Sequence, residues 1–91
     1  MEIINIKTYK HSDFIWGARG SIFGNPFEIG RDGTRKEIIQ KYEKWFNFAI
    51  KDPVFRNAVI SLKYKKVGCF CNYPIEDCHL RIIKNYLDNL K

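Results

Sequence analysis

The chain has 91 residues, of which 45% are hydrophobic and 15% aromatic, and this composition is typical of a folded domain and argues against disorder except at the extreme ends. No stretch approaches the roughly 18 apolar residues that a membrane-spanning helix requires. The formal net charge of +6 favours an anionic partner, either nucleotide, nucleic acid or an acidic host protein, although surplus surface lysine explains the same charge. We therefore expect a single domain over residues 1–91, located in the cytoplasm and without a membrane partner.

Two short strands and a long loop are predicted first. Residues 3–9 are rich in β-branched side chains and residues 13–16 follow a polar turn, so each range is typical of a strand. Residues 17–33 contain five of the six glycines and an Asn-Pro turn signal at Asn25. A loop of this length in so small a domain is usually functional.

Two helices are predicted after this loop. Thr34 and Glu37 form a capping box, so a helix begins there. Asp52 and Pro53 then supply the N-cap and the first residue of a second helix. Apolar residues recur at helical spacing in both, and the expected buried positions are Ile38, Tyr42, Trp45, Phe46 and Ala49, then Val54, Phe55, Ala58, Val59 and Leu62.

A strand over residues 65–71 and a last helix complete the predicted order. Asp77 is the expected N-cap of this helix, whose predicted buried positions are Leu80, Ile83, Leu87 and Leu90. The simplest packing is an α/β fold in which a short, mainly parallel sheet is covered by three helices. The final strand then runs parallel to the first, through a right-handed crossover.

All three cysteines and one of the two histidines lie within eleven positions, from Cys69 to His79. Side chains alternate along a strand, so Cys69 and Cys71 share one face and Phe70 points to the other. Cys78 and His79 are predicted in the first turn of the last helix, beyond the carboxyl end of the strand, where α/β proteins usually bind ligands. The odd number of cysteines argues against a disulfide framework.

This cluster has three chemical interpretations. Cys69, Cys71, Cys78 and His79 offer the ligand types of a zinc site, although the Cys-x-Cys spacing is short and adjacent residues diverge on a helix. Cys78 alone is a candidate nucleophile, because a helix N-terminus lowers the pKa of a thiol. The helix start also offers backbone N–H groups for an anion, with Arg81 nearby. Ordinary burial of the thiols, with His79 capping the helix, explains the same residues without a site.

The loop from Arg19 to Phe27 is the second unusual segment. Gly20 and Gly24 allow the backbone to approach a ligand, and Asn25 can form a hydrogen bond with its own turn. The pattern matches neither the Walker A motif nor the dinucleotide-binding motif. Arg19, Arg31 and Arg81 are the arginines that we expect to surround a bound anion.

The two segments together resemble a small family of unknown function that is common in bacteriophages and also occurs in bacteria. The residues that carry the resemblance are Arg19, the Gly24-Asn25-Pro26-Phe27 motif, Tyr42, Trp45, the Cys69-Phe70-Cys71 motif and the Cys78-His79 pair. The resemblance implies a cytoplasmic protein, in the host cytoplasm if it is phage-encoded, and no established activity. A looser resemblance to another uncharacterised family, with a Cys-His-Arg helix start, implies a small Rossmann-like domain.

We expect the domain to bind a phosphate-bearing ligand, a nucleotide or a nucleic-acid end, between these two segments, and to be able to process it. Arg19 and Arg81 would hold phosphate, Asn25 would orient the ligand or the loop, and Cys78 or His79 would act as nucleophile or proton carrier. The alternative is a non-enzymatic, zinc-stabilised module that binds nucleic acid or a host protein. The two hypotheses can be distinguished by metal content, because the alternative requires stoichiometric metal and unfolding on chelation.

Overall fold

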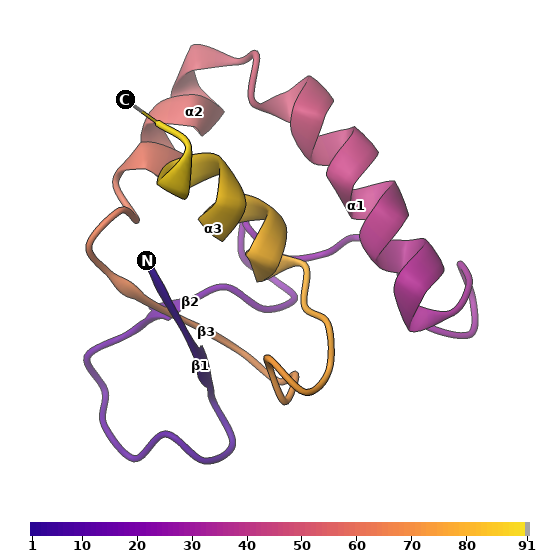
Figure 1. The fold of residues 1–91 in the computed structure, drawn as a ribbon, viewed down its shortest axis with the longest axis horizontal. Coiled ribbons are helices and arrows are strands. Elements are labelled where there is room, and N and C mark those ends of the chain that lie inside the picture. Colours follow the sequence, from indigo (N-terminus) through magenta and orange to yellow (C-terminus); the bar gives the residue numbers. More distant parts are fainter. Residues whose placement is uncertain (91) are drawn as a thin grey trace.

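A computed structural model describes residues 1–90 and shows three strands and three helices (Figure 1). The elements in chain order are β1 (Glu2–Asn5), β2 (Ile15–Trp16), α1 (Arg35–Ala49), α2 (Pro53–Ile60), β3 (Lys66–Cys69) and α3 (Leu80–Asp88). The strands form one sheet in the order β1-β3-β2, and both pairs are parallel. The predicted α/β fold, with a short parallel sheet and three helices, is confirmed.

The central strand β3 presents two different faces. Val67 is fully buried and lies close to Leu80, because a Cβ added at Gly17 would approach the side chains of both residues. Gly68 faces the other way, where a Cβ would come within 2.6 Å of Ile6 and 2.9 Å of Phe14. The connection between β1 and β2 therefore packs tightly on the sheet face opposite Val67.

The predicted starts of the first two helices are confirmed. Thr34 Oγ1 accepts a hydrogen bond from the backbone N–H of Glu37 at 3.3 Å, and the Glu37 carboxylate accepts one from the Thr34 N–H at 3.1 Å. At α2, the Asp52 carboxylate accepts from the Val54 N–H at 2.9 Å, with Pro53 as the first helical residue. Both motifs satisfy N–H groups that lack a partner within the helix.

The predicted start of the last helix is wrong by two residues. The N-cap is His79, not Asp77, and its side chain makes no capping hydrogen bond. The Asp77 carboxylate instead accepts hydrogen bonds from the Cys78 N–H at 2.9 Å and from the guanidinium of Arg81 at 2.7 and 3.0 Å. These contacts tie Asp77 to Cys78 and to α3, and the helix itself begins at Leu80.

Two smaller predictions are also corrected. The first strand ends at Asn5 rather than at residue 9, because the Asn5 carbonyl accepts hydrogen bonds from the N–H groups of Thr8 and Tyr9 and closes a turn. Val54 is 78% exposed instead of buried, since α2 turns Val59 inward and leaves its second residue facing solvent.

The hydrophobic core lies where the helices meet the sheet. In the view of Figure 1, α3 lies between the strands and α1. The largest fully buried side chains are those of Tyr42, Phe46, Leu62, Leu80 and Ile83. Among the helices of residues 1–90, none combines the length and apolar character that crossing a bilayer requires.

Candidate functional site

The three cysteine thiols form one cluster at the carboxyl end of β3. Their Sγ atoms all lie within 4.8 Å of one another, and those of Cys69 and Cys78 are 3.1 Å apart. Cys69 and Cys78 are fully buried, whereas Cys71 is half-buried, and all three are free thiols. The predicted proximity of the thiols is therefore confirmed.

A turn after β3 brings Cys78 back to Cys69. The Glu76 N–H donates to the Asn72 carbonyl at 2.8 Å, and the Glu76 carboxylate accepts from the Asn72 N–H at 3.2 Å. The Asn72 side chain also accepts a hydrogen bond from the amide of Asn5, at the end of β1, at 2.7 Å. These bonds fold residues 72–76 against the end of the sheet.

The structure reverses the expected acidity of the thiols. Contacts with the Cys69 and Cys71 thiols, together with burial, raise the pKa of Cys78, so the expectation of an acidic thiol there is wrong. Cys78 also precedes α3 instead of lying in its first turn, so it gains no stabilisation from the helix N–H groups. Hydrogen bonds from Cys69 and Cys78, and then the guanidinium of Arg35, lower the pKa of Cys71.

Arg35 is a site residue that the sequence motifs did not indicate. Its Nη1 lies 3.2 Å from Cys71 Sγ and donates to the Asp77 carbonyl at 3.2 Å, while its Nη2 pairs with the Glu76 carboxylate at 3.2 Å. A signal was nevertheless present, because a cation in the first turn of a helix is unfavourable toward the helix dipole. A residue placed against that preference needs partners elsewhere.

His79 is buried and faces two directions. Its Nε2 lies 2.9 Å from the Gly17 carbonyl, which can only accept, so Nε2 carries the proton and Nδ1 has the lone pair. Nδ1 is 3.9 Å from Cys78 Sγ, and the ring packs edge-on against Tyr42 at 5.0 Å. Burial lowers the pKa of His79 and so favours the neutral ring. The structure thus brings His79 to Cys78 but not into the group of three thiols.

A cavity of about 330 Å³ separates the glycine-rich loop from the cysteine segment. Arg19 and Asn25 line it from the loop, Arg35 lines it from α1, and Cys71 and His79 line it from the other side. The cavity therefore joins the two segments that the sequence singled out. Arg81 is not among its lining residues, and its guanidinium is bound to Asp77.

Asn25 holds the loop against α1. Its Oδ1 accepts from the Phe27 N–H at 2.9 Å, and its amide donates to the carbonyl of Ile38 at 3.5 Å. The preceding residue must be small, since a Cβ at Gly24 would lie 2.5 Å from the Ala18 carbonyl oxygen. Asn25 is therefore positioned to shape the wall of the cavity.

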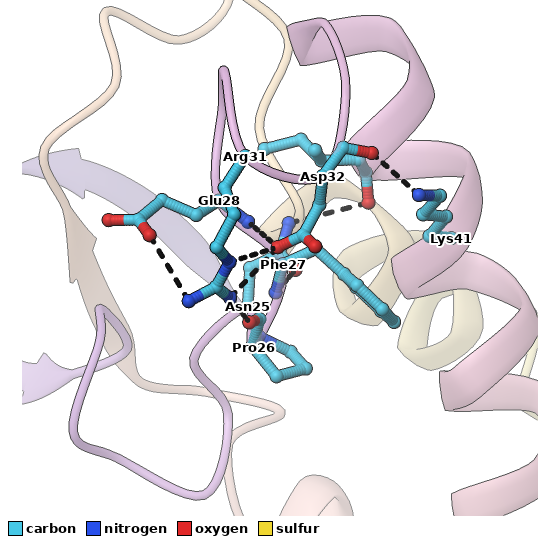
Figure 2. Close-up of polar contacts among 8 residues, drawn as sticks. Asn25, Pro26, Phe27, Glu28, Arg31, Asp32 and Lys41 are labelled. Atoms are coloured by element: carbon cyan, nitrogen blue, oxygen red, sulfur yellow. Dashed lines mark hydrogen bonds and ion pairs between the residues drawn. The ribbon is translucent and has the colours of Figure 1, made fainter.

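Arg31 organises the far end of the loop. Figure 2 shows its guanidinium between the carboxylates of Glu28, at 3.3 Å, and Asp32, at 2.9 Å. Lys41 of α1 donates to the Asp32 carbonyl at 2.6 Å and ties this end of the loop to the helix. Arg31 therefore serves the loop itself, and the expectation that it surrounds the anion gains no support from these contacts.

Comparison with known proteins identifies the family but no activity. The chain belongs to the domain of unknown function family DUF4326, whose profile matches residues 4–89. Over 60 residues it is 30% identical to an uncharacterised protein of Acanthamoeba polyphaga mimivirus, which covers 66% of this chain and 43% of the viral protein. The chain thus spans less than half the length of that relative. No solved structure matches.

The comparisons confirm the expected class of family, one of unknown function. The viral relative indicates no activity for the family, since it is itself uncharacterised. The bacteriophage or bacterial origin and the Rossmann-like fold that the resemblances implied stay predictions.

Proposed function

We propose that the chain binds a phosphate-bearing ligand, a nucleotide or the end of a nucleic acid, in the cavity between the Arg19–Phe27 loop and the Cys69–Arg81 segment. The cavity lies beyond the carboxyl end of a parallel strand, where α/β proteins commonly bind ligands. Its volume of about 330 Å³ is in the range of small-molecule sites.

The observation that carries this proposal is the pair of guanidinium groups, Arg19 and Arg35, that line the cavity from two elements. Arginine suits phosphate because its planar donors match the phosphate oxygens. Within residues 1–90, Arg19 forms no ion pair. The two carboxylates that line the cavity, Glu28 and Asp77, each already pair with an arginine close by in the sequence. The cavity therefore retains a donor for an incoming anion.

The proposal revises the expected roles of two residues. Arg35 takes the phosphate-binding role first given to Arg81, because Arg35 lines the cavity and Arg81 does not. The reactive thiol of a processing step is assigned to Cys71 rather than Cys78, because Cys71 lines the cavity and Cys78 is fully buried. His79 also lines the cavity, with an Nδ1 that can take a proton.

Replacement of Arg19 tests the proposal. Isothermal titration calorimetry would measure binding of inorganic phosphate, ADP and a 5′-phosphorylated oligonucleotide to the wild type and to Arg19→Ala. Loss of a charged hydrogen bond costs about 1.5–3 kcal/mol, so affinity should fall roughly tenfold to 100-fold. Arg56→Ala is the matched control, because it removes the same charge from α2, outside the cavity lining. Equal affinities in the two variants would remove Arg19 from the site.

The thiol cluster favours a second candidate function, a metal-stabilised module that binds nucleic acid or a host protein through its basic surface. The supporting observation is that three thiols lie within 4.8 Å of one another, and thiolates are preferred zinc ligands. Circular dichroism of the purified protein before and after chelation separates this candidate from the first. A structural ion requires stoichiometric metal and loss of folding on chelation.

A further inference from the structure

The thiol cluster and the cavity meet at Cys71. Cys69 and Cys78 lie fully buried behind it, while Cys71 is half-buried and lines the cavity beside Arg35. An ion held by all three sulfurs would therefore be screened from solvent on the side of the buried pair. Its accessible side would face the cavity.

We propose that the three thiolates hold a thiophilic divalent cation such as zinc, and that a phosphate oxygen of the ligand in the cavity completes its coordination. This inference rests on the proposed function for the identity of the fourth ligand. Zinc sites with three protein ligands and one exchangeable position bind substrate, whereas structural sites supply four protein ligands. The cluster is thus a ligand-binding metal site, in contrast to the closed zinc site of Cys69, Cys71, Cys78 and His79 that was one alternative interpretation of the sequence.

The sulfur positions suit such an ion. Tetrahedral zinc with bonds of about 2.3 Å places its sulfurs about 3.8 Å apart. The Cys69–Cys78 separation is 3.1 Å and all three separations are within 4.8 Å, so adjustments of about 1 Å or less bring the thiolates into place. Half-burial of Cys71 leaves room for this adjustment on the cavity side.

His79 is held apart from the ion by its other contacts. Its Nε2 is bound to the Gly17 carbonyl at 2.9 Å, and its ring packs against Tyr42. Its Nδ1 approaches Cys78 at 3.9 Å but does not join the group of mutually close metal-binding atoms, which within residues 1–90 contains only the three thiols. The fourth position is therefore left to the cavity.

The charges around the cluster agree with an exchangeable anionic ligand. Three thiolates and a divalent cation carry a net charge of −1, which the Arg35 guanidinium, 3.2 Å from Cys71 Sγ, would neutralise. Arg19 then supplies positive charge on the loop side of the same cavity. A phosphate between the ion and Arg19 would contact cationic groups at both ends.

Zinc affinity of ligand variants is the first test, measured by competition with a chromophoric chelator. Loss of an outer-shell partner already costs 10- to 100-fold in metal affinity, so Cys71→Ser should weaken zinc binding by more than about 100-fold. His79→Gln should keep stoichiometric zinc with less than about a tenfold loss, since Gln can still donate to the Gly17 carbonyl. Circular dichroism would establish that both variants fold. An equal loss in both variants, or no zinc in the wild type, overturns the inference.

The fourth position is tested in wild-type protein loaded with cobalt(II), whose absorption spectrum reports its ligands. Inorganic phosphate should shift the d–d bands and leave the thiolate charge-transfer band in place. An unchanged spectrum at phosphate concentrations that calorimetry shows to be saturating would overturn the inference and leave the proposed function standing. If calorimetry detects no binding of phosphate, ADP or oligonucleotide to either the metal-free or the zinc-loaded protein, the proposed function fails instead.

Discussion

Replacement of Tyr42 with phenylalanine should destabilise the protein without leaving a cavity. Tyr42 is fully buried in α1, and its hydroxyl donates to the Phe23 carbonyl of the glycine-rich loop at 3.0 Å. The phenyl ring of Tyr42→Phe fills the same space, so the change removes only this hydrogen bond. A buried carbonyl left without its donor costs about 1–3 kcal/mol. For a domain of this size, each kcal/mol lowers Tm by roughly 4–8 °C.

Thermal and urea unfolding, followed by circular dichroism, would measure this effect. Tyr64→Phe is the matched control, because Tyr64 is 89% exposed and its change should stay within about 0.5 kcal/mol. If Tyr42→Phe unfolds at the same temperature as Tyr64→Phe, the bond between α1 and the loop contributes nothing and the argument is refuted.

The unfolding free energies of the wild type and Tyr42→Phe should also depend differently on pH. Burial, and then the nearby Cys78, raise the pKa of Tyr42 above its ordinary value near 10. Above pH 10 the unfolded chain therefore releases this proton while the folded chain retains it, so stability that is present below pH 10 is lost as the pH rises. Tyr42→Phe lacks this loss. The difference in unfolding free energy between wild type and variant should shrink by up to about 1.4 kcal/mol per pH unit. A constant difference from pH 8 to pH 11 would contradict the burial of this hydroxyl.

Three further changes test the sheet, the cavity and the cluster. Gly68→Ala should lower the free energy of unfolding by about 1–3 kcal/mol in urea titrations, because its Cβ would press on Ile6 and Phe14. Phe70→Ala should weaken binding of ADP but not of inorganic phosphate in calorimetry, since this half-exposed ring lines the cavity and stacking on a base contributes about 1–3 kcal/mol. In metal-free protein, iodoacetamide at pH 7 should modify Cys71 first by mass spectrometry, because neighbouring thiols and a guanidinium lower its pKa and it reaches the cavity.

Local motifs were the part of the fold that the sequence predicted best. The capping box at Thr34 and the Asp52-Pro53 pair define helix starts through contacts within three residues, so no tertiary information is needed. The Asp77 start failed because Arg81, four residues later, takes the carboxylate in an ion pair. An aspartate can serve as an N-cap or as an ion-pair partner, and the sequence does not distinguish the two roles. In this structure Asp77 forms the ion pair.

The thiol cluster was predictable in part, because Cys69 and Cys71 are close in sequence and a short return turn brings Cys78 back to them whatever the exact helix start. Strand alternation was not the reason, since β3 ends at Cys69 and not at the predicted residue 71. The relative acidity of the three thiols could not be predicted from the sequence. It depends on which thiol stays near solvent and which one meets the guanidinium of a helix 36 positions away in the sequence. Such a contact has no local signature.

Arg35 shows why the site was harder to predict than the fold. A cation at the start of α1 opposes the helix dipole, at a cost of about 0.3–1 kcal/mol. Its contacts with Cys71, Glu76 and the Asp77 carbonyl offset that cost only when the cysteine segment folds against the helix. Local preference alone would place a carboxylate at this position, as Glu37 two residues later illustrates. A residue kept against its local preference and bound to the one thiol that lines the cavity is better explained by the chemistry of the site than by the stability of the helix.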